Sequence, residues 1–186
     1  MGMKWIFSLI LLVSAVFIYS LFYSNQESAI SNGMDPVMKI RSSAFENGGM
    51  IPVLYTCNGN GLIPPLLFEG VPKEARSMAL IVDDPAAADG IFTHWAVWNI
   101  APAAGGIAGG LPKGAKEGQN SSGRIGYYPP CPPRGEHKYY FRLYALDSML
   151  NLQTGASRRD VEAAMRGKIV GIQAVLIGKY EPTFGG

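Results

Sequence analysis

Hydrophobic residues recur along the chain in short runs that are separated by glycine, proline and polar residues. Five of these runs are rich in β-branched and aromatic residues, which pack well on a pleated surface and therefore predict strands. The five runs are residues 51–56, 78–83, 94–100, 138–146 and 172–180. Several of them alternate between apolar and polar positions, as half-buried strands do. The pattern predicts a mainly β domain.

The clearest alternation lies in residues 138–146, where neighbouring side chains of a strand point to opposite faces. One face carries Tyr139, Phe141, Leu143 and Ala145, and the other carries Tyr140, Arg142 and Tyr144. We expect the first face to pack on the core.

A helical pattern occurs once with clear start and stop signals, in residues 154–168. Ser157 is the expected N-cap, with Asp160 three residues later, and Gly167 is the expected stop. The residues expected on the buried face are Val161, Ala164 and Met165. One short helix is therefore expected beside the strands.

The connection between the third and fourth predicted strands, residues 102–136, is long and shows no element of its own. Loops of this length are usually functional or disordered. Within it, residues 129–133 read Pro-Pro-Cys-Pro-Pro, and proline rings fix φ and restrict the preceding residue. This stiff segment is suited to form the rim of a pocket.

The first part of the sequence has a different character, because no residue between Lys4 and Glu27 is charged. An apolar run of about 17–25 residues is long enough to span a bilayer. We expect residues 1–23 to be a signal anchor or a signal peptide, with a hydrophobic helix that meets the membrane through residues 5–22. Residues 24–36 are expected to be a linker. The remainder would be an extracytoplasmic domain, membrane-anchored or, after cleavage, secreted.

Residues 37–186 fit one domain of ordinary size. The formal net charge is +2 with both signs scattered, which gives no basic stripe and argues against nucleic acid as a partner. The sequence has two cysteines, Cys57 and Cys131. One hypothesis is that the two cysteines form a disulfide, as is common in an exported protein. The alternative is that both are small buried apolar residues with free thiols.

The two histidines of the chain, His94 and His137, each begin a strongly apolar predicted strand. Asp83 and Asp84 end another predicted strand, so that strand ends bring an acid and two imidazoles within reach. Each histidine alone also fits an ordinary core or surface residue. The pattern therefore leaves two interpretations open, a shared site or two structural histidines.

Two stretches of sequence resemble the signatures of the phosphatidylethanolamine-binding protein (PEBP) family. Residues 80–100, LIVDDPAAADGIFTHWAVWNI, resemble the D-P-D-A-P and T-H-W signature, and residues 126–147, GYYPPCPPRGEHKYYFRLYALD, resemble the second one. Residues 51–72 and 164–180 resemble the bacterial and archaeal branch, the Raf kinase inhibitor-like proteins of YbhB/YbcL type. The resemblance implies a β-sandwich of antiparallel-rich sheets with one or two short helices.

The resemblance also implies a small pocket that binds anions or phosphorylated ligands without catalysis. Motif positions assign its walls to Asp84, Phe92, His94, Tyr127, His137 and Tyr139. Protonated imidazoles would donate to the anion, and Asp84 would orient both histidines and keep them charged. No cofactor and no metal is expected. The sequence departs from the signature at Ala86, where the family commonly has a second aspartate.

Two other functions stay open at this point. Members of the family inhibit kinases or serine proteases, and residues 105–123 are the candidate for an exposed inhibitory loop. Asp84, His94 and His137 would also suit a metal-dependent hydrolase, because one carboxylate and two imidazoles are a common zinc or iron ligand set. Neither the H-x-x-x-H nor the H-x-E spacing of such enzymes is present, which favours the binding function.

Overall fold

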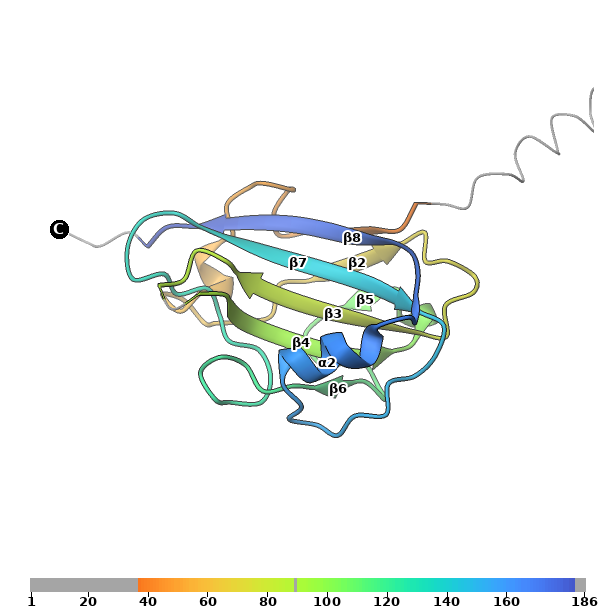
Figure 1. Ribbon diagram of the computed structural model, residues 1–186. Coiled ribbons are helices and arrows are strands. Elements are labelled where there is room, and N and C mark those ends of the chain that lie inside the picture. Colours follow the sequence, from red (N-terminus) through yellow and green to blue (C-terminus); the bar gives the residue numbers. More distant parts are fainter. Residues whose placement is uncertain (1–36, 89, 183–186) are drawn as a thin grey trace, which may run out of the picture. The chain divides into compact units, whose positions relative to one another are not determined.

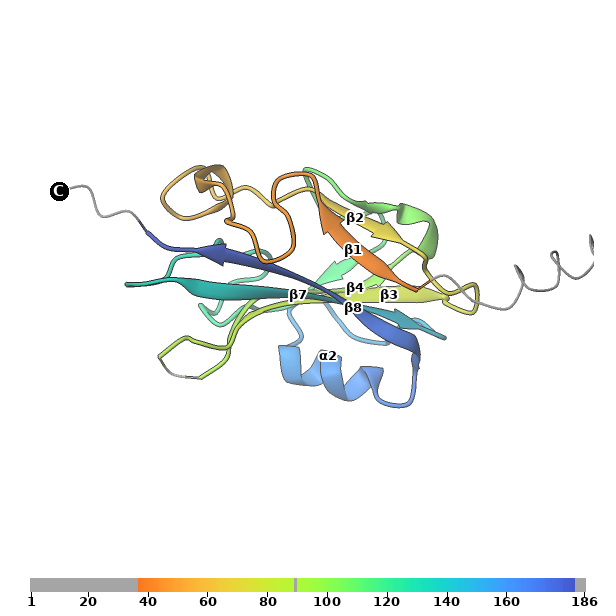
Figure 2. The same ribbon diagram turned by 90° about the horizontal axis from the view of Figure 1, so that it is seen from above.

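The structure is a computed structural model that describes residues 37–88 and 90–182. It consists of two antiparallel sheets and one α-helix, arranged in layers (Figure 1, Figure 2). The larger sheet has the strand order β6-β4-β3-β7-β8. Its members are β3 (Ser77–Asp84), β4 (Phe92–Ile100), β6 (Lys116–Glu117), β7 (His137–Leu146) and β8 (Ile169–Tyr180).

The smaller sheet has the order β1-β2-β5 and covers one face of the larger one. It is built from β1 (Lys39–Ser42), β2 (Leu66–Glu69) and β5 (Gly106–Ile107). Helix α2 (Arg158–Met165) lies against the opposite face, as Figure 2 shows. The large sheet is therefore covered on both sides.

This sandwiching explains why every residue of β3 is buried. Leu80 and Val82 enter the core between the sheets, whereas Ala79 and Ile81 enter the smaller core under α2. A strand with two covered faces is apolar at successive positions, which matches the continuous apolar run in the sequence. β7 differs, because its predicted inner residues are fully buried while Tyr140, Arg142 and Tyr144 are half-buried.

Four of the five predicted strands are confirmed as β3, β4, β7 and β8. The fifth, residues 51–56, is wrong: Val53–Tyr55 form a 3₁₀ turn, η1. Pro52 has no N–H to donate to a ladder. In addition, the hydroxyl of Thr56 donates to the carbonyl of Val53 at 2.9 Å, so that the segment closes on itself.

The predicted helix is confirmed as α2. Ser157 and Asp160 form a reciprocal capping box, in which the Asp160 amide donates to Ser157 Oγ and the Ser157 amide donates to the Asp160 carboxylate. Val161 and Met165 are buried. Gly167 follows the last turn with a positive φ of 73°, which suits glycine and ends the helix.

The long connection 102–136 is not structureless, contrary to expectation. It contains the 3₁₀ turn η2 (Pro102–Ala104) as well as β5 and β6, which join the smaller and the larger sheet respectively. These strands have only two residues each, too few to show a period in the sequence.

The predicted anchor and linker, residues 1–36, lie outside the described residues. Within residues 37–88 and 90–182, no helix has the length and hydrophobicity that crossing a membrane requires.

Candidate functional site

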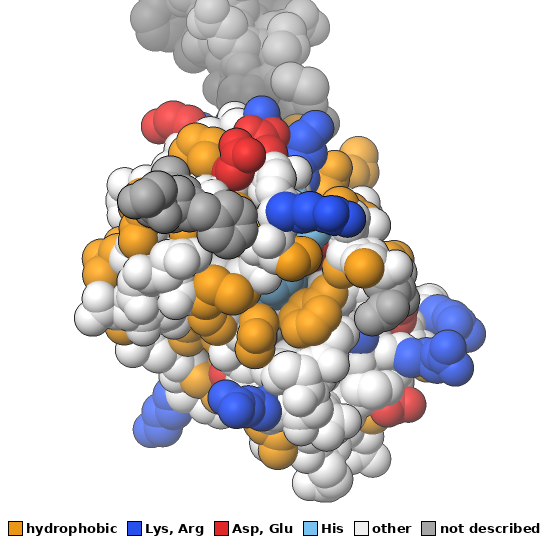
Figure 3. All heavy atoms as spheres, turned by 90° about the vertical axis from the view of Figure 1, so that its left-hand side faces the viewer, with side chains coloured by type: hydrophobic (Ala, Val, Ile, Leu, Met, Phe, Trp, Pro, Cys, Tyr) orange, Lys and Arg blue, Asp and Glu red, His pale blue; other side chains and the backbone are white. Residues whose placement is uncertain are grey.

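A pocket of about 140 Å³ lies where the end of β3 meets the starts of β4 and β7. Five of the six residues assigned to a ligand site line it, namely Asp84, Phe92, His94, His137 and Tyr139. The other lining residues come from two loops and are Ala87, Ala88, Tyr128, Cys131, Pro132 and Pro133. In Figure 3 histidine atoms are visible at the bottom of a hollow bordered by hydrophobic side chains.

His94 owes its orientation to an irregularity of β4. Val82 pairs with Trp95 and Asp83 with Thr93, so that His94 is an extra residue without a partner on β3. Such a β-bulge re-aims a side chain and is common beside functional sites. Consecutive side chains of a regular strand point to opposite faces, but the bulge places His94 and Trp95 on the same side of the sheet. The ring of His94 meets the ring of Tyr139 edge-on at 5.1 Å between centroids, and Trp95 enters the core between the sheets.

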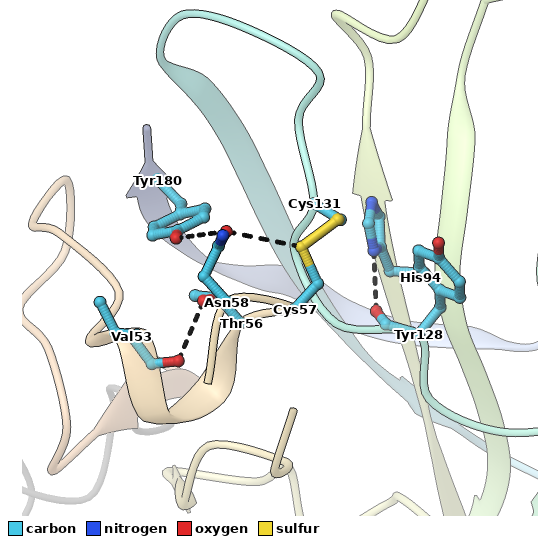
Figure 4. The surroundings of a disulfide bond; sticks show 8 residues. All are labelled: Val53, Thr56, Cys57, Asn58, His94, Tyr128, Cys131 and Tyr180. Carbon is cyan, nitrogen blue, oxygen red and sulfur yellow. Dashed lines mark hydrogen bonds between the residues drawn. A yellow bond between two sulfur atoms is a disulfide. The ribbon is translucent and has the colours of Figure 1, made fainter. Parts of the chain in front are cut away.

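One hydrogen bond fixes the tautomer of His94. Its Nδ1 lies 2.8 Å from the carbonyl oxygen of Tyr128, and because a carbonyl only accepts, Nδ1 carries the proton (Figure 4). The amide of Tyr128 returns a bond of 2.8 Å to the carbonyl of His94. In the neutral imidazole, Nε2 is then a lone-pair acceptor.

Burial lowers the pKa of His94 below its ordinary value of 6.5. The bond to Tyr128 and the charge of Asp84 act in the opposite direction, and His137 adds to the lowering. The desolvation is large because aromatic rings surround the imidazole, with the Phe92 ring centroid at 4.7 Å. Asp84 therefore raises the pKa of His94, in the expected direction, but does not outweigh the effect of burial.

Asp84 holds the other histidine. Its Oδ2 accepts a hydrogen bond of 2.6 Å from Nδ1 of His137, and its Oδ1 accepts from the amide of Ala86 at 2.8 Å. Both side chains of the pair are largely buried, with 6% and 14% exposed for Asp84 and His137. The carboxylate thus orients His137, and the residue in place of the family's second aspartate contributes only its backbone.

Tyr139 places a polar group in the pocket without a partner. Its side chain is completely buried, and its hydroxyl makes no hydrogen bond within the described part of the protein. Burial raises the pKa of this hydroxyl well above its usual range, and Asp84 adds to that effect. The backbone of Cys131 acts in the opposite direction, although its geometry falls short of a hydrogen bond.

Tyr127, the sixth assigned residue, does not line the pocket. Its ring packs edge-on against Trp95 at 5.6 Å between centroids, and its hydroxyl donates a long bond of 3.5 Å to the carbonyl of Tyr55. Burial raises its pKa, as expected for a phenol inside the core. The neighbouring Tyr128, which sequence reasoning missed, lines the pocket instead; the double tyrosine was the only signal for it.

The proline-rich segment 129–133 forms part of the rim of the pocket through Cys131, Pro132 and Pro133, as its stiffness suggested. A disulfide joins Cys131 of this rim to Cys57, which lies just after η1 (Figure 4). Next to it the amide of Cys57 donates to the carbonyl of Pro130 at 3.0 Å. The rim is thus attached to a segment that is 74 residues away in sequence.

The geometry also bears on the two alternative functions. Within the described residues, no cluster of three or more histidine, cysteine or acidic side chains is arranged to hold a metal ion. The candidate inhibitory loop, residues 105–123, is tied to both sheets through β5 and β6. Its inhibitory role stays a prediction.

Comparison with known proteins agrees with this architecture. A family model described as "Phosphatidylethanolamine-binding protein" matches residues 41–181. A UPF0098 protein of Methanothermobacter thermautotrophicus is 50% identical over 149 residues, which cover 77% of this chain and 98% of that protein. A UPF0098 protein of Pyrococcus abyssi is 44% identical over 162 residues, with 82% and 89% covered.

Solved structures give the same result. The crystal structure of a putative PEBP homologue from Chlamydia trachomatis superposes with a TM-score of 0.76 at 43% identity, and the match covers 79% of this chain and 99% of that one. The structure of YbcL from E. coli, described as a new member of the mammalian PEBP family, has a TM-score of 0.73 at 26% identity, with 78% and 99% covered.

Proposed function

Because the chain belongs to the phosphatidylethanolamine-binding protein family, whose fold binds ligands, we propose that it is a binding protein. The proposed ligand is a small anion or a phosphorylated, headgroup-like molecule, which the protein binds without catalysis. The proposed binding groups are His94, His137 and Tyr139. Asp84 is proposed as a positioning residue for His137.

The observation that carries this proposal is the unpartnered hydroxyl of Tyr139 beside two oriented imidazoles. A buried polar group without a hydrogen bond costs about 1–3 kcal/mol. A ligand oxygen that accepts from this hydroxyl removes the cost. Each histidine commits its Nδ1 to the protein, which leaves its Nε2 for a ligand.

The size of the pocket limits the ligand. Sites for drug-sized molecules usually measure about 300–1,000 Å³, whereas this one measures about 140 Å³. An inorganic anion or the phosphorylated end of a larger molecule matches this volume. The acyl chains of a lipid would stay outside, next to the apolar rim.

The protonation state of His94 sets the condition for binding. With Nδ1 bonded to the Tyr128 carbonyl, a neutral His94 presents a lone pair to the pocket, which repels an anion. An anion that contacts Nε2 therefore requires a proton there. We expect binding to be coupled to the uptake of a proton by His94.

Calorimetric titration of the purified protein with phosphate, phosphoethanolamine and zinc tests the proposal. We expect saturable binding of both phosphate compounds that disappears in the His94→Ala, His137→Ala double variant. Tight zinc binding without anion binding would contradict it and favour a metal site. An absence of binding by all three ligands would also contradict it.

A further inference from the structure

The disulfide lies in the wall of the pocket. Cys131 is one of the lining residues, between the prolines of the rim. The bond leads from this rim to Cys57, so that it connects the pocket directly to the segment around η1 (Figure 4).

The rim makes few backbone hydrogen bonds. Proline has no N–H, so that Cys131 carries the only backbone donor of residues 129–133. Within the described residues, the backbone hydrogen bond of this stretch runs from the Cys57 amide to the Pro130 carbonyl, and it joins the same two segments as the disulfide. The disulfide is therefore the covalent restraint on the rim, beside the packing of Pro130 and Pro132, which are buried.

The segment at the other end of the disulfide is firmly fixed. Thr56 is completely buried and bonds to Val53. Asn58 accepts a hydrogen bond of 2.8 Å from the hydroxyl of Tyr180 at the end of β8. Because this end belongs to the large sheet, the disulfide attaches the rim of the pocket to the body of the domain.

Tyr128, directly before the rim, transmits this restraint to the site. Its carbonyl receives the Nδ1 proton of His94, and its amide donates to the His94 carbonyl. Displacement of the rim would separate these groups and release both the tautomer and the orientation of His94. The state of the disulfide thus bears on a binding group that it does not contact.

Both cysteines are exposed, whereas His94 is buried. Exposed disulfides are open to attack by thiolates and tend to be the labile, regulatory ones. A reductant therefore reaches this bond from solvent without unfolding the core.

We propose that the Cys57–Cys131 disulfide is a redox switch of the pocket, which retains its anionic ligand when the bond is closed and releases it when a dithiol opens the bond. This inference rests on the proposed function. In the reaction, a thiolate of the dithiol attacks one sulfur, forms a mixed disulfide and expels the other cysteine. The second thiol then displaces the first cysteine, so that the protein gains two electrons and two protons and the dithiol becomes a disulfide.

The test combines phosphate titration with amide hydrogen exchange, on the oxidised protein, on the protein reduced with dithiothreitol and on the Cys57→Ser, Cys131→Ser double variant. We expect the dissociation constant for phosphate to rise about fivefold or more on reduction, a usual size for coupling between two sites. The amides of Tyr128 and Cys57 should exchange faster, while that of Leu143 in β7 stays protected and shows that the sheet is intact.

Equal phosphate affinity and equal protection of Tyr128 in the oxidised and reduced protein would overturn the switch. If the oxidised protein does not bind phosphate, the proposed function fails. Amide exchange alone then tests whether the disulfide controls the position of the rim. Loss of Tyr128 protection on reduction supports control of the rim in that case, and retained protection overturns it. If the double variant does not fold, the reduced wild-type protein supplies the same comparison.

Discussion

Oδ2 of Asp84 and Nδ1 of His137 lie 2.6 Å apart and form a largely buried hydrogen-bonded pair. The preceding residue, Asp83, serves the other face of the sheet. Its carboxylate pairs with Arg142 at 2.9 Å and with Arg158 of α2 at 3.2 Å. The two adjacent aspartates therefore have different roles. Asp84 orients a pocket histidine, and Asp83 attaches the helix to the sheet.

The first prediction concerns Asp84→Ala, which removes the acceptor of the His137 Nδ1 proton. Hydrogen bonds that involve charged groups contribute about 1.5–3 kcal/mol, so that the imidazole loses a strong restraint. We expect phosphate affinity to fall about tenfold. Removal of a negative charge beside the anion acts in the opposite direction, but it also removes the charge that raises the pKa of His94, so that His94 takes up the proton needed for anion binding less readily. Calorimetric titration measures the change, and tighter binding would contradict the orienting role.

Asp83→Ala is the matched control for this variant, because it removes the same side chain one position earlier. It leaves Arg142 and Arg158, whose side chains are 26% and 29% exposed, without the buried carboxylate, and loss of a hydrogen bond that involves a charged group costs about 1.5–3 kcal/mol. We expect urea denaturation to show this loss while phosphate affinity stays within about twofold of the wild type. A large loss of affinity here would mean that Asp84→Ala acts through general instability.

The second prediction separates the two neighbouring candidates for a ligand tyrosine. Tyr139→Phe removes a buried hydroxyl that has no partner in the described protein, so that stability should stay equal or rise by about 1 kcal/mol. Phosphate affinity should fall about fivefold to tenfold, as for one lost hydrogen bond to an anion. Tyr127→Phe should leave phosphate affinity unchanged, because that side chain does not line the pocket. Titration of both variants tests the assignment, and the reverse result would restore Tyr127 as the ligand residue.

The third prediction concerns stability. The disulfide closes a loop with a sequence separation of 74 residues, and removal of such a bond typically costs about 2–5 kcal/mol. We expect the urea midpoint of the Cys57→Ser, Cys131→Ser variant to fall accordingly. Addition of dithiothreitol should lower the midpoint of the wild type to the same value and leave that of the variant unchanged. An unchanged wild-type midpoint would show that the bond does not constrain the unfolded chain.

The sequence was sufficient for the long strands and for the capped helix. β3, β4, β7 and β8 each contain enough β-branched and aromatic side chains to be recognised as strands, and Ser157 with Asp160 marks the start of α2. The turn at Val53–Tyr55 was missed because its apolar residues gave a strand-like pattern, which the local bonds of Pro52 and Thr56 override. β5 and β6 were missed because two residues carry no period.

The site shows a similar division. Motif position was enough to bring together Asp84, His94 and His137, since strand ends and starts meet at one edge of the sheet. It did not reveal the β-bulge at His94, because an extra residue depends on the pairing of two strands. Motif position also assigned Tyr127 to the pocket in place of Tyr128, because a loop has no period that shows which of two adjacent side chains faces the pocket.

The fourth prediction follows from the lowered pKa of His94. In the unfolded chain this histidine takes up a proton near pH 6.5, whereas in the folded protein it does so only at lower pH. Between these two values the unfolded state binds more protons, so that stability falls as the pH decreases through this window and is fully present above it. Urea denaturation between pH 7.5 and about pH 5 should show this loss. It should be absent in His94→Asn, whose amide can still donate to the Tyr128 carbonyl but does not titrate.

Sulfate binding should have the opposite pH dependence, because an anion at Nε2 favours the protonated imidazole. Sulfate does not titrate in this range, so that any change in affinity comes from the protein. We expect its affinity to rise as the pH decreases through the same window, and calorimetry in two buffers with different heats of ionisation should detect the uptake of about one proton per anion. His94→Asn should bind sulfate weakly without proton uptake. Affinity that is independent of pH, or proton release on binding, would contradict the contact between the anion and Nε2 of His94.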